Sequence, residues 1–356
     1  MAIDTKNPPN TSDDLIKGTY IMTEVNGHLL KLRFDSGATS STINSLEVIG
    51  ETQRADNVNL NKVVSVKGAD GKEFSLLKFK TQEINTNTSQ SLNQTLIIYS
   101  AEQKSNECVY NKSEDGLYGL NAYSNSEFPV QLDYKNNKIH ILNTPTIPEG
   151  YQEIDADFQH NKIKIVTHIN NKKTKLLFDT GFDGFLAINK NPFNDDPPIE
   201  IVTLLLTVNN NLSVTKQKIY FNKRINVGGI AFDKTMLFVG SYIDNGLIGL
   251  SFINHFNWII DFQNKKLYLK KIKEFEVDES LKKIEGLTYK AMEFNNELLI
   301  ASKKTSEKKY NVGDKILSVN DERITKANIC EMQELLNNSS NWDDLKINTQ
   351  HIEYKN

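Results

Sequence analysis

The same short motif occurs twice in this chain, and the repeat constrains the fold more than any other feature. Residues 29–38 read "LLKLRFDSGA" and residues 174–183 read "TKLLFDTGFD". In each, an apolar stretch typical of a β-strand runs into Asp-Ser/Thr-Gly, at Asp35 and at Asp179. A single triplet of this kind arises by chance in many chains of this length, whereas two in the same context indicate an internal duplication.

The similarity extends upstream of each triplet, where the sequence predicts a β-hairpin. Alternating residues flank an Asn-containing turn, which is a strong hairpin signal. The two predicted hairpins are residues 20–34 with a turn at Asn26-Gly27, and residues 163–178 with a turn at Asn170-Asn171. When Asp35 is set on Asp179, the two turns coincide. We therefore expect two homologous β-rich halves.

A second repeated segment lies downstream of each triplet. Residues 115–142 and 245–269 each contain Gly-Leu-apolar-Gly-Leu, then an apolar strand, Asp-aromatic, an Asn/Lys turn and a final strand. This segment closes each half, so the sequence predicts one lobe at 15–145 and another at 150–272. The linker "NTPTIPEG" at 143–150 contains prolines and a glycine, which punctuate strands.

The end of the chain has a different pattern. Residues 286–300 predict two strands joined near Asn295-Asn296, and residues 310–324 predict two more. A helix is predicted at 325–337, followed by a final strand. Its apolar face would carry Ile329, Met332, Leu335 and Leu336. The predicted fold class is therefore mainly β, with two lobes followed by a small α+β domain.

Composition excludes several classes of function. With 42 Lys and Arg against 45 Asp and Glu, the formal net charge is −3, and we expect no nucleic-acid partner because no basic field favours one. Cys108 and Cys330 are too few for a disulfide framework and are not clustered as zinc ligands are, so we interpret both as free thiols. No His-Glu-x-x-His motif occurs, and we expect no metal site.

Targeting and membrane signals are absent from the sequence. The longest fully apolar runs, at 204–206 and 258–260, are far shorter than the roughly 20 residues of a membrane-spanning helix. The first residues, "MAIDTKNPPNTSDD", lack the basic-then-apolar pattern of a signal peptide. The sequence predicts a soluble protein without a transmembrane segment, which would be exported if a leader had been trimmed from this chain. It leaves the compartment open.

Two aspartates on facing loops favour a specific chemistry. Two carboxyl groups within a few ångströms cannot both ionise at low cost, so one keeps a proton at acidic pH while the other is charged. The charged group can take a proton from a water molecule while the protonated group hydrogen-bonds a substrate carbonyl. This unit hydrolyses a peptide bond with neither a covalent intermediate nor a cofactor.

On these motifs the chain resembles the pepsin-like and retroviral-type aspartic proteases, in which each lobe contributes an Asp-Thr/Ser-Gly loop and later an apolar-apolar-Gly segment. The matching segments are Asp35-Ser36-Gly37 with Leu117-Tyr118-Gly119, and Asp179-Thr180-Gly181 with Leu247-Ile248-Gly249. The resemblance covers about 15–272. It implies a bilobal fold and an aspartic endopeptidase that acts on an extended polypeptide by a catalytic pair, Asp35 and Asp179.

The same resemblance assigns roles to neighbouring residues. The Ser36 and Thr180 hydroxyls would brace the opposing loops, and Gly37 and Gly181 would let backbone amides approach the carboxylates. Asp183 matches an aspartate that contacts the substrate backbone in the retroviral enzymes, although a solvated or loop-capping role is the alternative.

Two positions depart from the pepsin-like pattern. Ala38 and Phe182 follow the two glycines, where pepsin-like enzymes usually have Ser or Thr. Ala38 is similar to the retroviral form, whereas Phe182 matches neither. A flap hairpin is expected over the cleft, and residues 63–77 fit it, although no tyrosine lies near their turn. The resemblance places substrate contacts at that turn, formed by Gly68, Ala69, Asp70 and Gly71.

The segment 280–356 resembles PDZ domains. Gly286-Leu287-Thr288-Tyr289 is similar to their carboxylate-binding loop, and "VGDKILSVNDERI" is similar to their Gly-Asp-x-Ile-Leu-x-Val-Asn strand. Such a domain binds an extended peptide as an added strand and holds its terminal carboxylate with backbone amides. The resemblance therefore implies that peptide C-termini are partners at Gly286, Leu287, Thr288 and Tyr289. A module that only packs against the rest of the chain is the alternative.

Two other interpretations of the whole chain remain open. One is a catalytically silent peptide-binding protein that keeps the cleft as a recognition surface. The other is a duplicated β protein in which Asp35 and Asp179 merely end strands. The presence of both aspartates in matching loops favours the endopeptidase.

Overall fold

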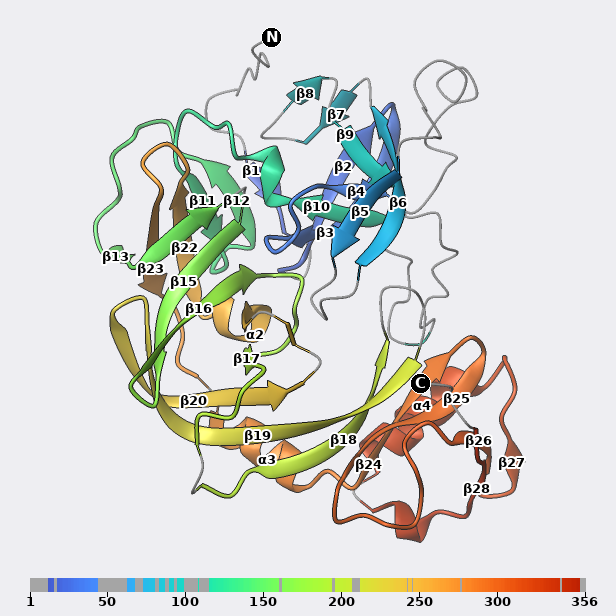
Figure 1. Ribbon diagram of the computed structural model, residues 1–356. Helices are drawn as coiled ribbons and strands as arrows, with labels where there is room; N and C mark the ends of the chain where they lie inside the picture. The colour runs from blue at the N-terminus through green and yellow to red at the C-terminus, as the bar shows by residue number, and fades with distance from the viewer. Residues whose placement is uncertain are drawn as a thin grey trace.

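In a computed structural model the chain is mainly β. The structure describes residues 12–15, 18–43, 63–67, 73–80, 83–86, 90–92, 95–98, 108, 115–159, 162–193, 196–206, 212–241, 243–244, 246–275, 277–339 and 341–352. Two large sheets and a third, smaller sheet organise these residues (Figure 1). In the part of the chain that is described, no helix is long and apolar enough to cross a membrane.

The N-terminal sheet is formed by strands from the first half of the chain. These are β2 (Tyr20–Val25), β3 (His28–Asp35), β4 (Thr42–Ile43), β5 (Val63–Lys67), β6 (Glu73–Lys80), β7 (Glu83–Asn85), β8 (Gln90–Leu92), β9 (Thr95–Ile98) and β10 (Gly116–Gly119). Their spatial order is β5-β6-β9-β4-β10-β3-β2-β7-β8. Most neighbours are antiparallel, but β10 runs parallel to β3 and β9 runs parallel to β4.

The C-terminal sheet repeats this arrangement. Its strands from the second half are β14 (Ala156–Gln159), β15 (Lys162–Ile169), β16 (Lys172–Asp179), β17 (Leu186–Ile188), β18 (Ile199–Leu206), β19 (Leu212–Val227), β20 (Ile230–Gly240) and β21 (Leu247–Gly249). They are ordered β14-β15-β16-β21-β17-β20-β19-β18. The run from β18 to β15 therefore corresponds, strand by strand, to the run from β5 to β2. The two parallel pairs, β16 with β21 and β17 with β20, also correspond.

A third sheet joins the two halves. Its strands are β1 (Ser12–Asp14), β11 (Val130–Asp133), β12 (Lys138–Ile141), β13 (Gln152–Ile154), β22 (Phe256–Asp261) and β23 (Lys266–Lys271), in the order β1-β12-β11-β22-β23-β13. In the repeat, Val130 corresponds to Trp258 and Leu132 corresponds to Ile260. The register pairs Val130 with Ile260 and Leu132 with Trp258, as a twofold axis between β11 and β22 requires.

The short helices lie at corresponding places. The 3₁₀ turn η1 (Leu120–Ala122) follows β10, and α2 (Leu250–Ile253) follows β21. The helix α3 (Val277–Glu285) comes after β23 and contacts β19 and β20. Large buried side chains from both halves form one continuous core, in which the Phe178 and Trp258 rings lie 4.8 Å apart.

The predicted hairpin turns are confirmed. Asn26 and Gly27 connect β2 to β3 with φ values of 50° and 83°. Asn170 and Asn171 connect β15 to β16 with φ values of 47° and 61°. Asn and Gly tolerate this left-handed conformation, which matches the twist of the paired strands. The pairs Asn295-Asn296 and Asn320-Asp321 adopt it too.

The C-terminal segment follows α3 and has its own core. It contains β24 (Tyr289–Phe294), β25 (Glu297–Lys304), β26 (Lys315–Val319), β27 (Glu322–Arg323), α4 (Ile329–Asn338), the 3₁₀ turn η2 (Trp342–Asp344) and β28 (Ile347–Gln350). Fourteen of its residues, including Trp342, are buried in one cluster with Leu204 of β18, and the Trp342 ring stacks on Tyr289 at 5.1 Å. We call residues 289–352 the tail.

The tail helix differs in two details from the sequence expectation. It begins at Ile329 rather than at residue 325, because the Asn328 side chain accepts a hydrogen bond from the Thr325 amide at 2.7 Å and closes a turn. Met332 and Leu336 are buried with Ile329, but Leu335 is 43% exposed. The predicted apolar face is therefore wrong at Leu335.

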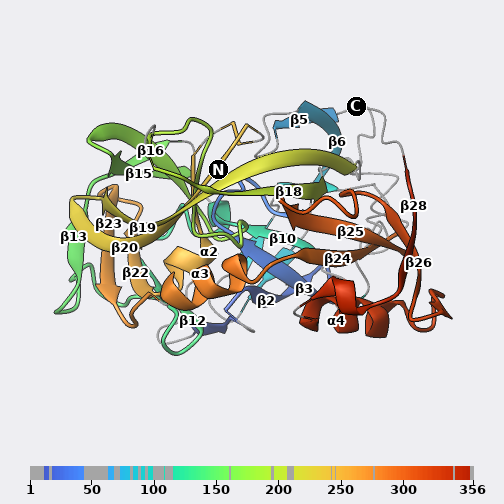
Figure 2. The ribbon, with the colours of Figure 1, turned by 90° about the horizontal axis from the view of Figure 1, so that it is seen from below.

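The tail is joined to the C-terminal sheet by strand pairing. β25 pairs antiparallel with β18, with Ile201 opposite Lys304 and Thr203 opposite Ser302. The Thr305 amide extends this ladder by donating to the Glu200 carbonyl at 3.0 Å. Figure 1 and Figure 2 both show β18 reaching from the second half into the tail, drawn in orange and red. The second sheet therefore continues into the tail without a break.

The prediction of two free thiols is wrong. Cys108 and Cys330 form a disulfide, with their Cα atoms 4.9 Å apart. This separation lies within the usual range for the bond. Cys108 belongs to the first half, and Cys330 lies in the first turn of α4. Their distance of 222 residues along the chain explains why no local spacing indicated the pair.

Candidate functional site

Each candidate aspartate lies at the end of a strand, beside a glycine of a parallel strand. Asp35 ends β3 opposite Gly119, and Asp179 ends β16 opposite Gly249. Strand β10 pairs in parallel with β3 in the first half, and β21 pairs in parallel with β16 in the second half. Because the two halves are related by an approximate twofold axis, the two loops meet where the strands end.

The glycines after the aspartates let the two loops approach closely. A Cβ atom at Gly37 would lie 2.6 Å from the Asp179 Cγ atom, and one at Gly181 would lie 2.5 Å from the Asp35 Cγ atom. Real Cβ atoms do not come so close, so neither position has room for a side chain. Each aspartate is thus packed against the backbone of the opposite loop.

Ser36 and Thr180 connect the loops by reciprocal hydrogen bonds. The Ser36 amide donates to the Thr180 Oγ1 atom and the Thr180 amide donates to the Ser36 Oγ atom, both at 2.9 Å. Each hydroxyl then donates to a strand carbonyl of the other half, Ser36 to Phe178 and Thr180 to Phe34, both at 2.8 Å. Both residues are buried. All four backbone groups are satisfied across the interface, and the loops are held in register.

The environment separates the two carboxyl groups. Burial, the neighbouring charge of Asp35 and a hydrogen bond to that carboxylate raise the pKa of Asp179 well above its ordinary value. Burial also raises the pKa of Asp35, but the Gly37 and Ala38 amides, the hydrogen bond from Asp179 and the Arg33 charge oppose this shift. The arrangement therefore favours a proton on Asp179 and a negative charge on Asp35.

The amides that favour ionised Asp35 are close to it. Gly37 donates to its Oδ1 atom at 2.8 Å, and Ala38 donates to the same atom at 3.0 Å. In the other loop, the Gly181 amide donates to the Asp179 Oδ1 atom at 2.9 Å. The glycines of the motif therefore supply carboxylate hydrogen bonds as well as space.

The Phe182 ring fills space inside its own half. A Cβ atom on Gly184 would lie 2.2 Å from the ring, and one on Gly249 would lie 2.6 Å from it. The Phe182 carbonyl accepts a hydrogen bond from the Leu250 amide at 2.7 Å, which ties the loop to α2. The departure from the pepsin-like pattern thus adds an apolar contact behind the second loop.

Asp183 forms an ion pair that the sequence did not indicate. Its Oδ1 atom accepts a hydrogen bond from the Arg33 guanidinium, which reaches across from the other half. The Asp183 side chain is 69% exposed, whereas that of Arg33 is 12% exposed. An arginine two residues before the first aspartate was the signal available in the sequence. Nothing in the sequence indicated that Asp183, 150 residues away, would be the partner of this arginine.

The candidate flap is described in its strands but not at its turn. β5 and β6 pair antiparallel, with Val63 opposite Leu77 and Lys67 opposite Glu73. The expected contact residues Gly68, Ala69, Asp70 and Gly71 lie outside the described residues. The hairpin therefore exists where it was predicted, at the edge of the N-terminal sheet that corresponds to β18 and β19.

The candidate carboxylate loop of the tail is engaged within the chain. The Gly286 amide donates to the Lys282 carbonyl at 2.9 Å, and the Leu287 amide donates to the Ile284 carbonyl at 3.1 Å, so both end helix α3. Tyr289 is buried, and its hydroxyl accepts a hydrogen bond from the Lys309 amide at 3.1 Å. A peptide carboxylate at this loop would have to displace these hydrogen bonds. Thr288, between them, is partly buried.

Helix α4 occupies the strand edge beside that loop. The Asn337 side chain donates to the Ala291 carbonyl at 2.9 Å and accepts from the Ala291 amide at 2.8 Å. The Gln333 side chain accepts from the Glu293 amide at 2.5 Å. These two side-chain amides bond the free edge of β24 as the backbone of an added strand would.

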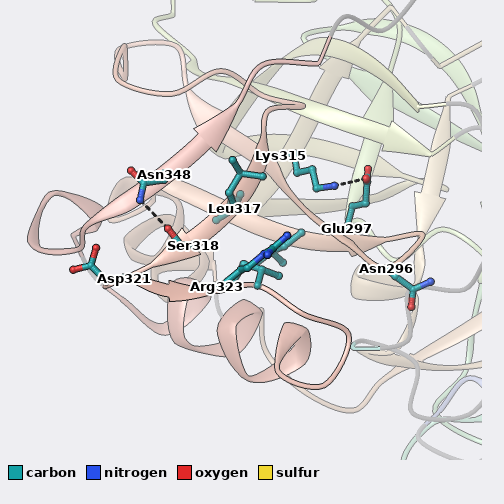
Figure 3. Close-up of a pocket in the computed structure, with 11 residues that line it drawn as sticks. Asn296, Glu297, Lys315, Leu317, Ser318, Asp321, Arg323 and Asn348 are labelled. Atoms are coloured by element: carbon teal, nitrogen blue, oxygen red, sulfur yellow. Dashed lines mark hydrogen bonds and ion pairs between the residues drawn. The ribbon is translucent and has the colours of Figure 1, made fainter.

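A pocket of about 600 Å³ lies elsewhere in the tail (Figure 3). Its walls come from β25, β26, β27, β28 and the adjoining turns, and Lys315 and Glu297 in the lining form an ion pair. The lining residues are Asn296, Glu297, Leu298, Lys315, Ile316, Leu317, Ser318, Asp321, Arg323, Ile324 and Asn348. Neither aspartate of the pair contributes to it, so it is separate from the candidate site.

The described residues contain no group of three or more His, Cys, Asp or Glu side chains arranged to hold a metal ion. The candidate site brings together two carboxyl groups, two hydroxyl groups and backbone amides. Comparison of the sequence with models of known protein families finds no match, and comparison with curated proteins finds none either.

Proposed function

We propose that the protein is an aspartic endopeptidase built on a bilobal, pepsin-like fold, in which Asp35 and Asp179 activate a water molecule. The single observation that carries this proposal is the reciprocal packing of the two loops. Each aspartate lies against the glycine of the opposite loop, and the Ser36 and Thr180 hydroxyls lock the pair in place. A catalytically silent protein would need neither the close approach nor a proton shared between two adjacent carboxyl groups.

The chemistry follows from the different environments of the carboxyl groups. Ionised Asp35 takes a proton from a water molecule while the water oxygen attacks the peptide carbonyl carbon. Protonated Asp179 gives its proton to the carbonyl oxygen. The resulting gem-diol collapses when the amide nitrogen receives the proton held by Asp35 and one hydroxyl returns its proton to Asp179. The C–N bond then breaks, and the pair regains its starting state.

We further propose that the tail is a PDZ-like module that braces the enzyme. Three contacts support this role: the pairing of β25 with β18, the Cys108–Cys330 disulfide, and the Asn337 amide on the edge of β24. The first two attach the tail to both halves. The third occupies the edge at which a peptide would add as a strand.

The disulfide also bears on where the protein works. Protein disulfides persist in oxidising compartments and are rare where thiols are kept reduced. We therefore propose that the enzyme functions outside the reducing cytosol, on polypeptides that it meets there.

A proteolysis assay on denatured serum albumin across about pH 2 to 8 tests the endopeptidase. The pair works with one shared proton, so activity should peak at acidic pH and be lost when Asp179 ionises. Asp35→Asn and Asp179→Asn should each lower kcat/KM by about 10⁴-fold, and the double variant should lose little more. The control is Asp233→Asn, since Asp233 is 78% exposed and pairs with Arg224. No cleavage by the unmodified protein at any pH, or near-full activity in either single variant, would refute the assignment.

A further inference from the structure

The two candidate catalytic loops share their hydrogen bonds but not their charges. Arg33 lies two residues before Asp35, and the corresponding residue before Asp179 is Leu177. Leu177 is buried in a small apolar cluster with Leu247. Asp183 likewise has no charged counterpart, because Thr39 holds that place in the first loop. One ion pair therefore breaks an otherwise symmetric site.

The geometry fixes this charge at the boundary between the halves. The Arg33 side chain leaves β3 and is largely buried, and its guanidinium donates to the Asp183 Oδ1 atom in the opposite loop. The Asp183 carbonyl accepts a hydrogen bond from the Ser251 hydroxyl at the start of α2. Asp183 is thus held from two sides, and it holds the guanidinium in turn.

Backbone amides alone do not distinguish the two aspartates strongly. Asp35 accepts from the Gly37 and Ala38 amides, and Asp179 accepts from the Gly181 amide, with the Phe182 amide also lowering its pKa. The charge of Arg33 lowers the pKa of Asp35, whereas the main charge that acts on Asp179 is that of Asp35, which raises its pKa. Arg33 thus acts on the pair through its charge, and Asp183 forms an ion pair with Arg33.

We propose that the Arg33–Asp183 ion pair biases the negative charge of the pair toward Asp35, because Arg33 and Asp35 lie two residues apart on one face of β3, whereas the apolar Leu177 holds the corresponding place before Asp179. This inference rests on the proposed endopeptidase and adds a positioning residue to it. Arg33 acts together with the Gly37 and Ala38 amides to favour Asp35 as the base and a proton on Asp179. Asp183 then partly offsets the Arg33 charge and so limits its effect on Asp35. This role explains the position of Asp183 without a substrate contact.

The test compares the pH profile of kcat/KM in variants that remove either end of the pair. Arg33→Gln removes the cation that favours ionised Asp35, so the acidic limb should move up by about one pH unit. Asp183→Asn leaves the cation without its counter-charge, so the acidic limb should move down. Arg33→Lys should stay near the unmodified profile. Arg224→Gln, which breaks an exposed ion pair, is the matched control and should move neither limb.

The opposite direction of the two shifts separates this role from simple fastening. If the ion pair only held the halves together, Arg33→Gln and Asp183→Asn would lose the same contact. Both would then lower the melting temperature with an unchanged pH profile, and the inference would be overturned. Shifts of equal sign would overturn it as well.

A second readout does not depend on activity. A carboxyl group whose pKa is raised on folding contributes stability that is fully present below its unfolded pKa and is lost as pH rises through its folded pKa. Arg33→Gln raises the pKa of Asp35 further, so the fall in melting temperature should extend to higher pH, and with Asp183→Asn it should end at lower pH. Asp35→Asn removes one of the two carboxyl groups and so shows how much of the pH dependence of the melting temperature comes from the pair. If the protein cleaves nothing, the proposed function fails, while these melting curves still decide the inference: shifts in these directions support it and their absence overturns it.

Discussion

The hairpins β5–β6 and β18–β19 occupy the same place in the two halves, yet they have different neighbours. Among the described strands, β5 pairs only with β6 and ends the N-terminal sheet, whereas β18 pairs with β19 on one side and with tail strand β25 on the other. An unpaired edge strand can open more easily than one with hydrogen bonds on both sides. The comparison shows how a duplicated fold can keep one hairpin available for movement while the other becomes an attachment site.

The two loops that carry Asp35 and Asp179 show the opposite behaviour. Their hydrogen bonds agree closely in the two halves, at 2.8 and 2.9 Å for the corresponding pairs. Symmetry is kept where both halves must meet at one axis, and it is lost at the hairpins and at Arg33. Each of the following predictions tests how far the two halves are equivalent.

The largest effect should follow from filling the space beside either aspartate. Gly37→Ala and Gly181→Ala should each lower kcat/KM by about 100-fold, because the new methyl group would push the facing carboxyl group out of position. Equal losses would show that the two loops are equivalent. The control is Gly229→Ala, where a Cβ atom meets nothing within 4 Å, so that only backbone strain at its φ of 94° lowers stability. A loss confined to one loop would contradict the symmetry.

The next effect concerns the disulfide between the first half and the tail. Cys108→Ser and Cys330→Ser should each lower the free energy of unfolding by about 2–4 kcal/mol, because the unfolded chain regains the freedom that the cross-link removes. The double variant should lose no more than either single variant. Thermal unfolding with and without a reducing agent measures this. An unchanged melting temperature on reduction would show that the tail is held by β18 alone.

Removing either bracing hydroxyl should cost somewhat less. Ser36→Ala and Thr180→Ala each leave a buried amide and a buried carbonyl without partners, which should lower the free energy of unfolding by about 2 kcal/mol. Thr180→Ser keeps the hydroxyl and should retain most of the stability. Chemical denaturation of the three variants gives the comparison. Markedly unequal losses for the two alanine variants would mean that one half dominates the interface.

The smallest effect is a difference in hydrogen exchange between the two hairpins. Amides of β18 should exchange more slowly than amides of β5, because β18 has neighbours on both sides. The corresponding hairpins β2–β3 and β15–β16 serve as the internal reference. Exchange followed by mass spectrometry resolves these peptides. Equal rates for β5 and β18 would show that the pairing with β25 does not hold the second hairpin.

Local patterns in the sequence were sufficient for much of the frame. The Asn26-Gly27 and Asn170-Asn171 turns, the alternating strands around them and the later Gly-Leu segments were all predicted and lie where expected. Each depends on residues a few positions apart, and turn chemistry and strand alternation act over that range. The start of the helix at Ile329 was not predicted, because the Asn328 side chain closes a turn with the Thr325 amide just before the helix.

Other features needed the folded chain. The Cys108–Cys330 bond spans 222 residues, and the Arg33–Asp183 contact spans 150. The bonds of Asn337 to β24 and of β18 to β25 likewise join elements whose separate patterns show no preference for one another. No periodicity in the sequence reports such pairs, because they depend on which surfaces meet after both halves have folded.

The amino-acid sequence by itself determined that there are two related β-rich halves, each with an aspartate at the end of a strand and a glycine after it. A duplicated pattern of strands and turns folds in the same way twice, because short-range interactions do not depend on the rest of the chain. Only the tertiary structure decided which carboxylate pairs with the Arg33 guanidinium, which hairpin joined the tail and whether the two cysteines bonded. Those choices depend on single long-range contacts, whose free energies are set by burial and by neighbours that the chain brings together only on folding.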